Sequence, residues 1–255
     1  MLVENNTFIV TGGASGLGEQ VIRTLVAQRG RAIIIDINAD RAQNLVKELG
    51  ADNVYFPGSV DVTHKEQVQE VFKDIKSVYP DWPIVGAILC SGVVFPPENL
   101  KGYGPNGQLT SFEQFKHIVN VNLLGTYCVA QKVAEILLDN KPLDNDDGER
   151  GVIIATSSIL GLDGSLLAYG SSKAGVAGLT LPMARELAGF GIRVVSIAPG
   201  PFETPLVKNA PMEAPPCLFP KRHGRASEFA DLVLQIISNR MLNGTVIRLD
   251  GALRG

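Results

Sequence analysis

Short runs of apolar residues alternate with longer stretches of helical periodicity along the whole chain. The runs are nearly continuous and rich in isoleucine and valine, which is typical of parallel strands that are covered on both faces. They predict strands at Phe8–Thr11, Ala32–Asp36, Val54–Phe56, Ile84–Cys90, Val152–Thr156, Val194–Ala198 and Thr245–Arg248.

Between the predicted strands, apolar residues recur every three or four positions, as they do on the buried face of a helix. This spacing predicts helices at Leu17–Arg29, Asp40–Leu49, Lys65–Tyr79, Phe112–Leu138, Tyr169–Phe190 and Ala226–Asn239. Strands and helices that alternate in this way favour an α/β fold, in which helices cover both sides of a parallel sheet. Because neither the composition nor the pattern changes along the chain, we expect one domain over residues 1–255.

Three stretches interrupt the alternation and predict loops. Phe95–Leu109 and Pro199–Pro220 are rich in proline, and Lys141–Arg150 is polar and acidic. The second of these contains seven prolines and follows the carboxyl end of a strand, which is the edge where open α/β sheets bind ligands. Because long loops inside compact domains are often lids, we expect a substrate lid at about residues 199–225.

The composition argues against several classes of function. Charged residues make up 19% of the 255, and the net charge of -3 gives no electrostatic reason to expect nucleic acid or an anionic membrane as a partner. No apolar run approaches the roughly 20 residues that span a bilayer, and Met1–Thr7 does not resemble a targeting segment. Cysteines and histidines show no metal-ligand spacing, so we expect no metal, reduced thiols and a cytoplasmic location.

The sequence TGGASGLG (Thr11–Gly18) lies between the first predicted strand and the first predicted helix. Gly12 allows a tight turn, Gly16 lets the backbone approach a pyrophosphate at the helix N-terminus, and Gly18 lets the helix pack closely on the sheet. Asp36 ends the second strand, where a carboxylate accepts hydrogen bonds from the ribose hydroxyls of adenosine and repels a 2′-phosphate. An ordinary strand–helix turn is the alternative, but the context predicts a site for NAD rather than NADP.

Tyr169 and Lys173 are four residues apart at the start of a predicted helix, so their side chains share one face. An ammonium group lowers the pKa of a nearby phenol, and such a pair can exchange a proton with a substrate oxygen. The same spacing also occurs on ordinary solvated helices. Ser157 and Ser158 end the preceding strand, where a serine hydroxyl can hydrogen-bond the substrate oxygen. The strand register favours Ser158, and Ser157 remains the alternative.

Together these segments resemble the short-chain dehydrogenase/reductase family over essentially the whole chain. The family's TGxxxGxG matches TGGASGLG, and its YxxxK matches YGSSK (Tyr169–Lys173). VNVNLLG (Val119–Gly125) matches the helix segment that carries a catalytic asparagine, and PGPFETP (Pro199–Pro205) matches the segment that closes over nicotinamide. The resemblance implies a Rossmann-type, doubly wound sheet of seven parallel strands, and a homodimer or homotetramer built on the two long helices.

The resemblance also implies a chemistry, the NAD-dependent interconversion of a secondary alcohol and a ketone. In it Tyr169 is the general acid/base, and Lys173 lowers its pKa while binding the nicotinamide ribose. Ser158 holds the substrate oxygen, and Asn122 holds a helix bulge and a water behind Lys173. The implied cofactor contacts are Gly12, Ser15, Gly16, Leu17, Gly18, Asp36, Asp61, Val62, Gly92, Tyr169, Lys173, Pro199 and Thr204.

Three segments depart from the family pattern. The family's Asn-Asn-Ala-Gly is replaced by Leu89-Cys90-Ser91-Gly92, so asparagines that would brace the strands and the cofactor pocket are missing. Ser158 lies closer to Tyr169 than is usual, which predicts a shortened loop at Gly161–Leu167. The lid stretch Lys208–Pro220 also differs, and lids largely set substrate choice.

The substrate is the least determined part of the prediction. Thr180–Val207 and Asn243–Arg254 resemble family members that act on 3-hydroxyacyl-CoA thioesters and hydroxysteroids, which implies such a substrate. Lys221, Arg222 and Arg225 would then either meet the phosphates of CoA or form a solvated basic turn. A biosynthetic ketoreductase for a specialised metabolite is one alternative. A nucleotide-binding scaffold without catalysis is another, although it would not need the catalytic residues that this chain retains.

Overall fold

The computed structural model describes residues 3–95, 110–143, 147–208 and 216–254, and it contains a seven-stranded parallel sheet. The strands lie in the order β3-β2-β1-β4-β5-β6-β7. Their bounds are β1 Thr7–Thr11, β2 Arg31–Ile35, β3 Val54–Tyr55, β4 Ile84–Leu89, β5 Gly151–Thr156, β6 Ile192–Pro199 and β7 Val246–Leu249. The predicted doubly wound fold with seven parallel strands is therefore confirmed, and the strand ends differ from the expected ones by at most two residues.

The strands at the centre of the sheet are apolar because helices cover both of their faces. Every residue of β4, β5 and β6 is buried. The residues of β7, at the edge of the sheet, are only half-buried. The continuous apolar runs in the sequence follow from this two-sided burial.

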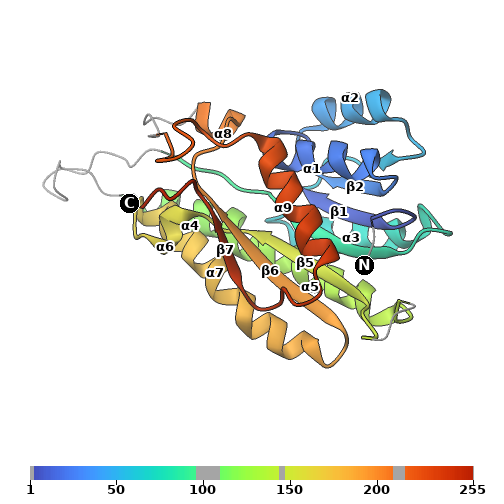
Figure 1. Cartoon of the computed structure of the whole chain (residues 1–255). Helices are drawn as coiled ribbons and strands as arrows, with labels where there is room; N and C mark the ends of the chain where they lie inside the picture. The colour runs from blue at the N-terminus through green and yellow to red at the C-terminus, as the bar shows by residue number, and fades with distance from the viewer. Residues whose placement is uncertain (1–2, 96–109, 144–146, 209–215, 255) are drawn as a thin grey trace, which may run out of the picture.

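The helices form one layer on each side of the sheet, as Figure 1 shows. One layer contains α1 (Gly16–Ala27), α2 (Ala39–Leu49) and α9 (Ala226–Ser238). The opposite layer contains α3 (Lys65–Asp74), α5 (Thr126–Asp139) and α7 (Leu167–Ala188). Each layer packs its apolar stripe on the sheet, which creates a separate hydrophobic core on either face.

The long helix predicted at Phe112–Leu138 is not continuous in the structure. It consists of α4 (Phe112–Val119), a π-helical turn η2 (Asn120–Gly125) and α5. A π-turn inserts one residue while the apolar spacing on either side continues, so the hydrophobic pattern did not reveal it. Such turns are frequent at functional sites.

Short helices account for the other differences from the predicted elements. The helix expected to reach Tyr79 ends in a 3₁₀ turn, η1 (Ile75–Ser77), and α7 begins at Leu167 rather than at Tyr169. Two stretches expected as loops contain α6 (Ile159–Leu162) and α8 (Pro205–Lys208). A four-residue helix is too short to show a helical period, which is why the pattern missed both. The expected loop Phe95–Leu109 lies almost entirely outside the described residues.

The stretch Phe112–Asp139 is, within the described ranges, the one helix long and apolar enough to cross a membrane. Half of its most apolar window is buried inside the protein. Val129, Val133 and Leu137 on α5 belong to the core against the sheet. The apolar character of this stretch is therefore explained by its place in the core.

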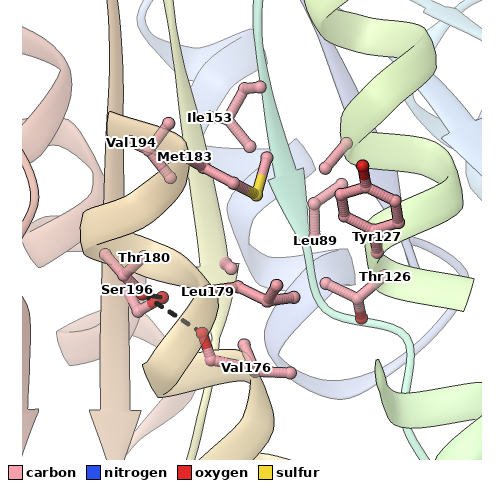
Figure 2. A pocket seen from close by; sticks show the side chains of 12 residues that line it. Leu89, Thr126, Tyr127, Ile153, Val176, Leu179, Thr180, Met183, Val194 and Ser196 are labelled. Atoms are coloured by element: carbon pink, nitrogen blue, oxygen red, sulfur yellow. Dashed lines mark hydrogen bonds between the residues drawn. The ribbon is translucent and has the colours of Figure 1, made fainter. Parts of the chain in front are cut away.

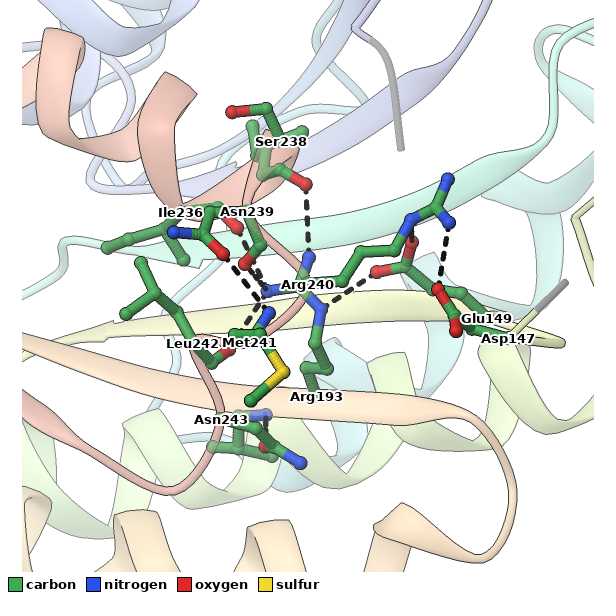
Figure 3. Close-up of polar contacts among 12 residues, drawn as sticks. Asp147, Glu149, Arg193, Ile236, Ser238, Asn239, Arg240, Met241, Leu242 and Asn243 are labelled. Carbon is green, nitrogen blue, oxygen red and sulfur yellow. Dashed lines mark hydrogen bonds and ion pairs between the residues drawn. The ribbon is translucent and has the colours of Figure 1, made fainter. Parts of the chain in front are cut away.

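A buried cation holds the amino-terminal edge of β6 to α9, as Figure 3 shows. The Arg193 side chain is 7% exposed and pairs with Glu149 at 2.8 Å. Its remaining hydrogen bonds go to the carbonyl oxygens of Ile236, Ile237, Asn239 and Leu242 at the end of α9. Ile236 and Ile237 lie in the last turn of α9, where carbonyls have no partner within the helix, so the guanidinium satisfies them and complements the helix dipole. Asn239 and Leu242 follow the helix.

Candidate active site

The glycine-rich loop lies where the order of the strands reverses, between β1 and β4. Gly12 has φ +64°, and a Cβ there would come within 2.9 Å of the backbone of Cys90 and Ser91 at the end of β4. A Cβ on Gly18 would collide with the carbonyl oxygen of Gly12. The loop is therefore packed so closely that side chains at these two positions are excluded, as the sequence predicted.

The N-terminus of α1 follows this loop and opens toward the carboxyl edge of the sheet. Ser15 is its N-cap residue, and its hydroxyl makes no capping hydrogen bond. Gly16 (φ +56°) and Leu17 begin the helix, so their backbone N–H groups belong to the first turn, which has no carbonyl partners within the helix. Free N–H groups at a helix N-terminus and a free hydroxyl fit the pyrophosphate of a dinucleotide.

Asp36 lies directly beside the glycine-rich loop. One oxygen of its carboxylate accepts a hydrogen bond from the Ala14 N–H at 3.0 Å, and the other accepts one from the Asn38 N–H at 2.9 Å. The carboxylate is thus fixed at the carboxyl end of β2, on the adenosine side of the loop. This is the position where a ribose of a bound dinucleotide would be held.

Asp61, Val62 and Gly92 border the same region. Asp61 accepts hydrogen bonds from the N–H and the hydroxyl of Thr63, and Val62 is buried against Gly125 of the π-turn. A Cβ on Gly92 would come within 3.3 Å of both the Asn122 Oδ1 and the Lys173 Nζ atoms. A side chain at this position would therefore crowd both groups.

Ser157 and Ser158 have different partners, which separates the two alternatives. The Ser157 hydroxyl is buried and donates to the carbonyl oxygen of Lys173 at 2.8 Å. The Ser158 hydroxyl is the N-cap of α6, accepts a hydrogen bond from the Leu160 N–H at 3.2 Å and acts to lower the pKa of the neighbouring Tyr169 phenol. The geometry favours Ser158 as the serine available to a substrate, because the hydroxyl of Ser157 is committed to the backbone.

Lys173 is 3% exposed, and its ammonium group donates to the carbonyl oxygen of Thr156 at 2.7 Å. Its Nζ atom lies 5.8 Å from the centre of the Tyr169 ring. Burial disfavours the charged form and lowers the pKa of Lys173 to about 8. Near neutral pH the group therefore still carries a proton, but it loses that proton far more readily than an exposed lysine does.

The pKa of Tyr169 moves in the direction opposite to the expected one. Burial of the phenol raises its pKa to about 12, although the hydrogen bond with Ser158 acts to lower it. The ammonium group of Lys173 points at Thr156 rather than at the phenol oxygen, so it does not offset the desolvation of the phenolate. In the protein alone, Tyr169 is therefore held in the protonated form.

Asn122 is fully buried within the π-turn and braces the segment after β4. Its Oδ1 atom accepts a hydrogen bond from the Val93 N–H, and its Nδ2 atom donates to the Val93 carbonyl oxygen and to the Ser172 hydroxyl. Ser172 in turn donates to the carbonyl oxygen of Tyr169 at 2.7 Å. Asn122 thus connects the cofactor side of the sheet to the first turn of α7.

Ser172 is a site residue that sequence reasoning missed. It is fully buried, and it joins Asn122 to the backbone of Tyr169. A polar residue directly before Lys173, on the buried side of an apolar helix, was a signal that could have identified it.

The first part of the predicted lid packs on the glycine-rich loop. Pro199 ends β6, and Thr204 is 6% exposed, with its Cβ atom 3.4 Å from the position that a Cβ on Gly16 would occupy. Thr204 therefore lies at the place where a lid residue could contact a bound cofactor. The stretch 209–215 lies outside the described residues.

Among the basic residues Lys221, Arg222 and Arg225, the side chain of Arg222 is paired with a carboxylate of the protein. Arg222 donates to both carboxylate oxygens of Glu228, at 2.6 and 2.9 Å. Glu228 also accepts a hydrogen bond from the Arg225 N–H, and its pKa falls to about 2 because of these partners. The charge of Arg222 is thus balanced within the protein, which favours the structural alternative for this residue over contact with CoA phosphates.

Leu89 and Cys90, which replace the family's asparagines, both have matching neighbours in the structure. Leu89 is buried opposite Ala155 in the parallel pair β4–β5, so an apolar side chain faces an apolar neighbour. Cys90 accepts a hydrogen bond from the Thr156 hydroxyl at 3.4 Å, and burial raises the pKa of its thiol to about 11. A neutral thiol and a leucine thus occupy positions where the family braces its strands with amides.

A small cavity lies between α5, α7 and the sheet, and Ser158, Tyr169 and Lys173 do not line it (Figure 2). Leu89, Tyr127 and Met183 contribute to its lining, and its volume of about 10 Å³ is near that of a single water probe. It is therefore too small to bind a substrate. The π-turn, α5 and α7 also expose large apolar side chains, namely Leu124, Tyr127, Leu138, Leu167 and Leu181.

Comparison with known proteins agrees with this geometry. The family model for short chain dehydrogenase matches residues 6–214. The chain is 40% identical to human 3-hydroxyacyl-CoA dehydrogenase type-2 over 96% of this chain and 94% of that protein. It is 32% identical to ipsdienol dehydrogenase of Ips pini over 99% and 98%.

A solved structure gives the same result. The 3-hydroxyacyl-CoA dehydrogenase type-2 of Mycobacterium avium superposes with a TM-score of 0.87 at 35% identity, over 98% of this chain and 96% of that one. The fold, the glycine-rich loop and the pair Tyr169 and Lys173 agree with the family match. The chain belongs to the short-chain dehydrogenase/reductase family and is an oxidoreductase.

Proposed function

We propose that the protein interconverts a secondary alcohol and a ketone, with NAD as the cofactor. One observation carries the proposal: Ser158, Tyr169 and Lys173 converge at the carboxyl edge of the sheet, next to the loop that fits a dinucleotide. When bound, the nicotinamide supplies or accepts the hydride.

The side chains divide the remaining tasks among them. The Tyr169 hydroxyl gives its proton to the substrate oxygen in reduction and takes it back in oxidation. Ser158 hydrogen-bonds the same oxygen and orients it. Lys173 supplies a positive charge in a buried site, where charge acts more strongly than it does in water. Asn122 and Ser172 position Tyr169 and the segment after β4 without touching the substrate.

The cofactor preference is the first testable consequence. Asp36 would face the 2′-phosphate of NADP, and the cations that could neutralise it are absent from Ala14–Gly18 and from Ile37. We expect NADH to bind at least about tenfold more tightly than NADPH, because repulsion between two charges in direct contact at a partly buried position costs more than about 1.4 kcal/mol. Fluorescence titration with both cofactors measures the two Kd values.

The variant Asp36→Asn provides the matching control, because it keeps an acceptor for the Ala14 N–H but removes the charge. It should narrow the gap between NADH and NADPH. Asp40→Asn, on the exposed first turn of α2, should leave the gap unchanged. Equal affinities for the two cofactors in the unmodified protein would show that the carboxylate of Asp36 does not face the ribose.

For the substrate we propose a 3-hydroxyacyl-CoA/3-ketoacyl-CoA pair or a hydroxysteroid. Similarity to proteins named 3-hydroxyacyl-CoA dehydrogenase type-2 supports the proposal. Exposed apolar side chains at the carboxyl edge of the sheet, Phe95, Leu162 and Leu206, would suit an acyl chain or a ring system. The relative named ipsdienol dehydrogenase supports the alternative of an alcohol in a specialised biosynthesis.

A substrate panel decides between these proposals. We expect NADH consumption with acetoacetyl-CoA or with a steroid ketone, read optically at neutral pH, and little with small polar ketones. Turnover of only a terpenoid or polyketide ketone would favour the biosynthetic alternative. No turnover of any ketone or alcohol, together with retained NADH binding, would instead favour a scaffold without catalysis.

We further propose a homodimer or homotetramer formed through α5 and α7. Large apolar side chains exposed on these helices, Tyr127 and Leu138 on α5 and Leu181 on α7, support this proposal, because association with a second copy would remove them from water. All three cysteines are free thiols, which supports a reducing, cytoplasmic location.

A further inference from the structure

An ionic cluster at the end of β7 connects three segments that surround the proposed active site. Arg248 donates to both carboxylate oxygens of Asp163, each at 2.7 Å, and to Asp250 at 2.6 Å. A fourth hydrogen bond from the same guanidinium goes to the Leu253 carbonyl oxygen. Asp250 also accepts from Arg254, so two cations face two carboxylates.

Three of the four side chains in the cluster are mostly shielded from water, whereas Arg254 is 60% exposed. The side chains of Asp163, Arg248 and Asp250 are 13%, 22% and 7% exposed. Two-pronged contacts between arginine and carboxylate fix geometry as well as charge, and shielding strengthens them. An exposed ion pair of the usual kind would not hold its segments in this way.

Asp163 connects the cluster to the serine of the proposed site through one helical turn. It is the C-cap residue of α6, and Ser158 is the N-cap residue of the same helix. The Asp163 N–H donates to the Ile159 carbonyl oxygen, and the Gly161 N–H donates to that of Ser158. A shift of Asp163 is therefore transmitted to Ser158 across five residues of hydrogen-bonded backbone.

The same turn packs on the helix that carries Tyr169. A Cβ on Gly161 would meet the backbone of Lys173 and Ala174, and a Cβ on Gly170 would meet the carbonyl oxygens of Leu160 and Ser165. The backbones of α6 and α7 thus touch without intervening side chains. The position of α6 fixes the first turns of α7.

The other side of the cluster holds the base of the lid. The carbonyl oxygen of Gly251 accepts hydrogen bonds from the N–H groups of Leu218 and Phe219, at 3.1 and 3.2 Å. Gly200 packs closely on Asp250. Two parts of the predicted lid, at Gly200 and at Leu218 and Phe219, are therefore attached to Asp250 and to Gly251.

We infer that Arg248 is a positioning residue, which through Asp163 holds α6, and with it Ser158 and Tyr169, in register with the base of the substrate lid. The inference rests on the proposed function. It assigns a role in the reaction to a residue on the last strand, far in sequence from the Ser–Tyr–Lys residues.

The test is Arg248→Met, alone and combined with Asp163→Asn, with kcat, KM and the Kd of NADH measured for a ketone that the unmodified protein reduces. Arg248→Met removes both hydrogen bonds to Asp163. We expect kcat to fall about ten- to a hundredfold, because small displacements of reacting groups have effects of this size. The Kd of NADH should change much less than kcat does, since the glycine-rich loop is not attached to the cluster, and the double variant should be no slower than Arg248→Met.

Arg240→Met is the matched control, because Arg240 also pairs with two carboxylates but lies at the opposite edge of the sheet (Figure 3). Its kcat should equal that of the unmodified protein. Asp163→Glu retains the charge and should keep most of the activity. If Arg248→Met does not fold, Asp163→Asn and Asp163→Glu decide the question by the same measurements.

Three results would overturn the inference: an unchanged kcat in Arg248→Met or Asp163→Asn, a parallel weakening of NADH binding, or losses that multiply in the double variant. Failure of the proposed function is distinguishable from these. In that case the unmodified protein itself would reduce no ketone.

Discussion

Tyr169→Phe should lower kcat by about 10²- to 10⁴-fold, the range expected when general acid–base catalysis is lost. The variant keeps the ring and its packing but removes the oxygen that Ser158 contacts. The Kd of NADH should barely change, because the phenol is expected to face the substrate. Steady-state kinetics with NADH and the best ketone of the panel, together with a fluorescence titration, measure both quantities.

The control for this variant is Tyr79→Phe. The Tyr79 hydroxyl donates to the Ala51 carbonyl oxygen at 3.0 Å, far from the candidate site in the fold, so its loss removes a hydrogen bond but no catalytic group. Its kcat should be unchanged. If Tyr169→Phe retained more than about a tenth of the wild-type kcat, the assignment of Tyr169 as the acid and base would fail.

The pH dependence should follow from the protonation of the same phenol. Because burial raises the pKa of Tyr169 to about 12, the protonated form predominates across neutral pH. Ketone reduction uses this form as the acid and should vary little between pH 6 and about 8. Alcohol oxidation needs the phenolate, and its kcat/KM should rise as the pH rises.

Lys173→Met should have the second large effect, which differs in kind from that of Tyr169→Phe. It removes a buried charge and the hydrogen bond to the Thr156 carbonyl oxygen. We expect slower turnover by about 10²-fold or more, since a buried charge that assists proton transfer is lost. NADH binding should weaken as well, because the family resemblance implies contact with the nicotinamide ribose.

The pH dependence of the loss of turnover in Lys173→Met tests whether the positive charge of Lys173 assists the reaction. Burial lowers the pKa of Lys173 to about 8, so its charge is present below that pH and is lost above it. The difference in alcohol oxidation between the unmodified protein and Lys173→Met should therefore shrink as the pH rises through this range. Lys73→Met, an exposed lysine on α3, is the control and should behave like the unmodified protein. A deficit that stays constant with pH would contradict a role for the charge.

The sequence by itself determined the sheet, the order of its elements and the family. Parallel strands that are covered on both faces must be apolar throughout, so each strand could be recognised in the sequence as a short apolar run. The role of the glycines in Thr11–Gly18 could also be predicted, because the backbone at Gly12 and Gly18 packs so closely that it excludes any side chain. The pair Tyr169 and Lys173 could be predicted because residues that are four positions apart lie on one face of a helix.

The tertiary structure alone decided how these groups are partnered. The preference for Ser158 over Ser157, which the strand register had already indicated, gains support from the Ser157 hydroxyl reaching the carbonyl oxygen of Lys173, a contact between two elements 16 residues apart. The direction of the pKa shift of Tyr169 depended on where the Lys173 ammonium group points. Hydrogen-bond partners and burial are set by the packing of separate elements, and local spacing carries no information about them.

The π-turn and the Arg248 cluster also could not be predicted from the sequence. Asn120–Gly125 keeps its apolar spacing while its backbone adds a residue, so the pattern read as one helix. Arg248 and Asp163 are 85 residues apart, and charged residues in a sequence give no sign of which opposite charge they will meet. Periodic burial can be recognised from the spacing of apolar residues in the sequence. Contacts between distant side chains form only when the folded sheet brings the ends of its strands to one edge.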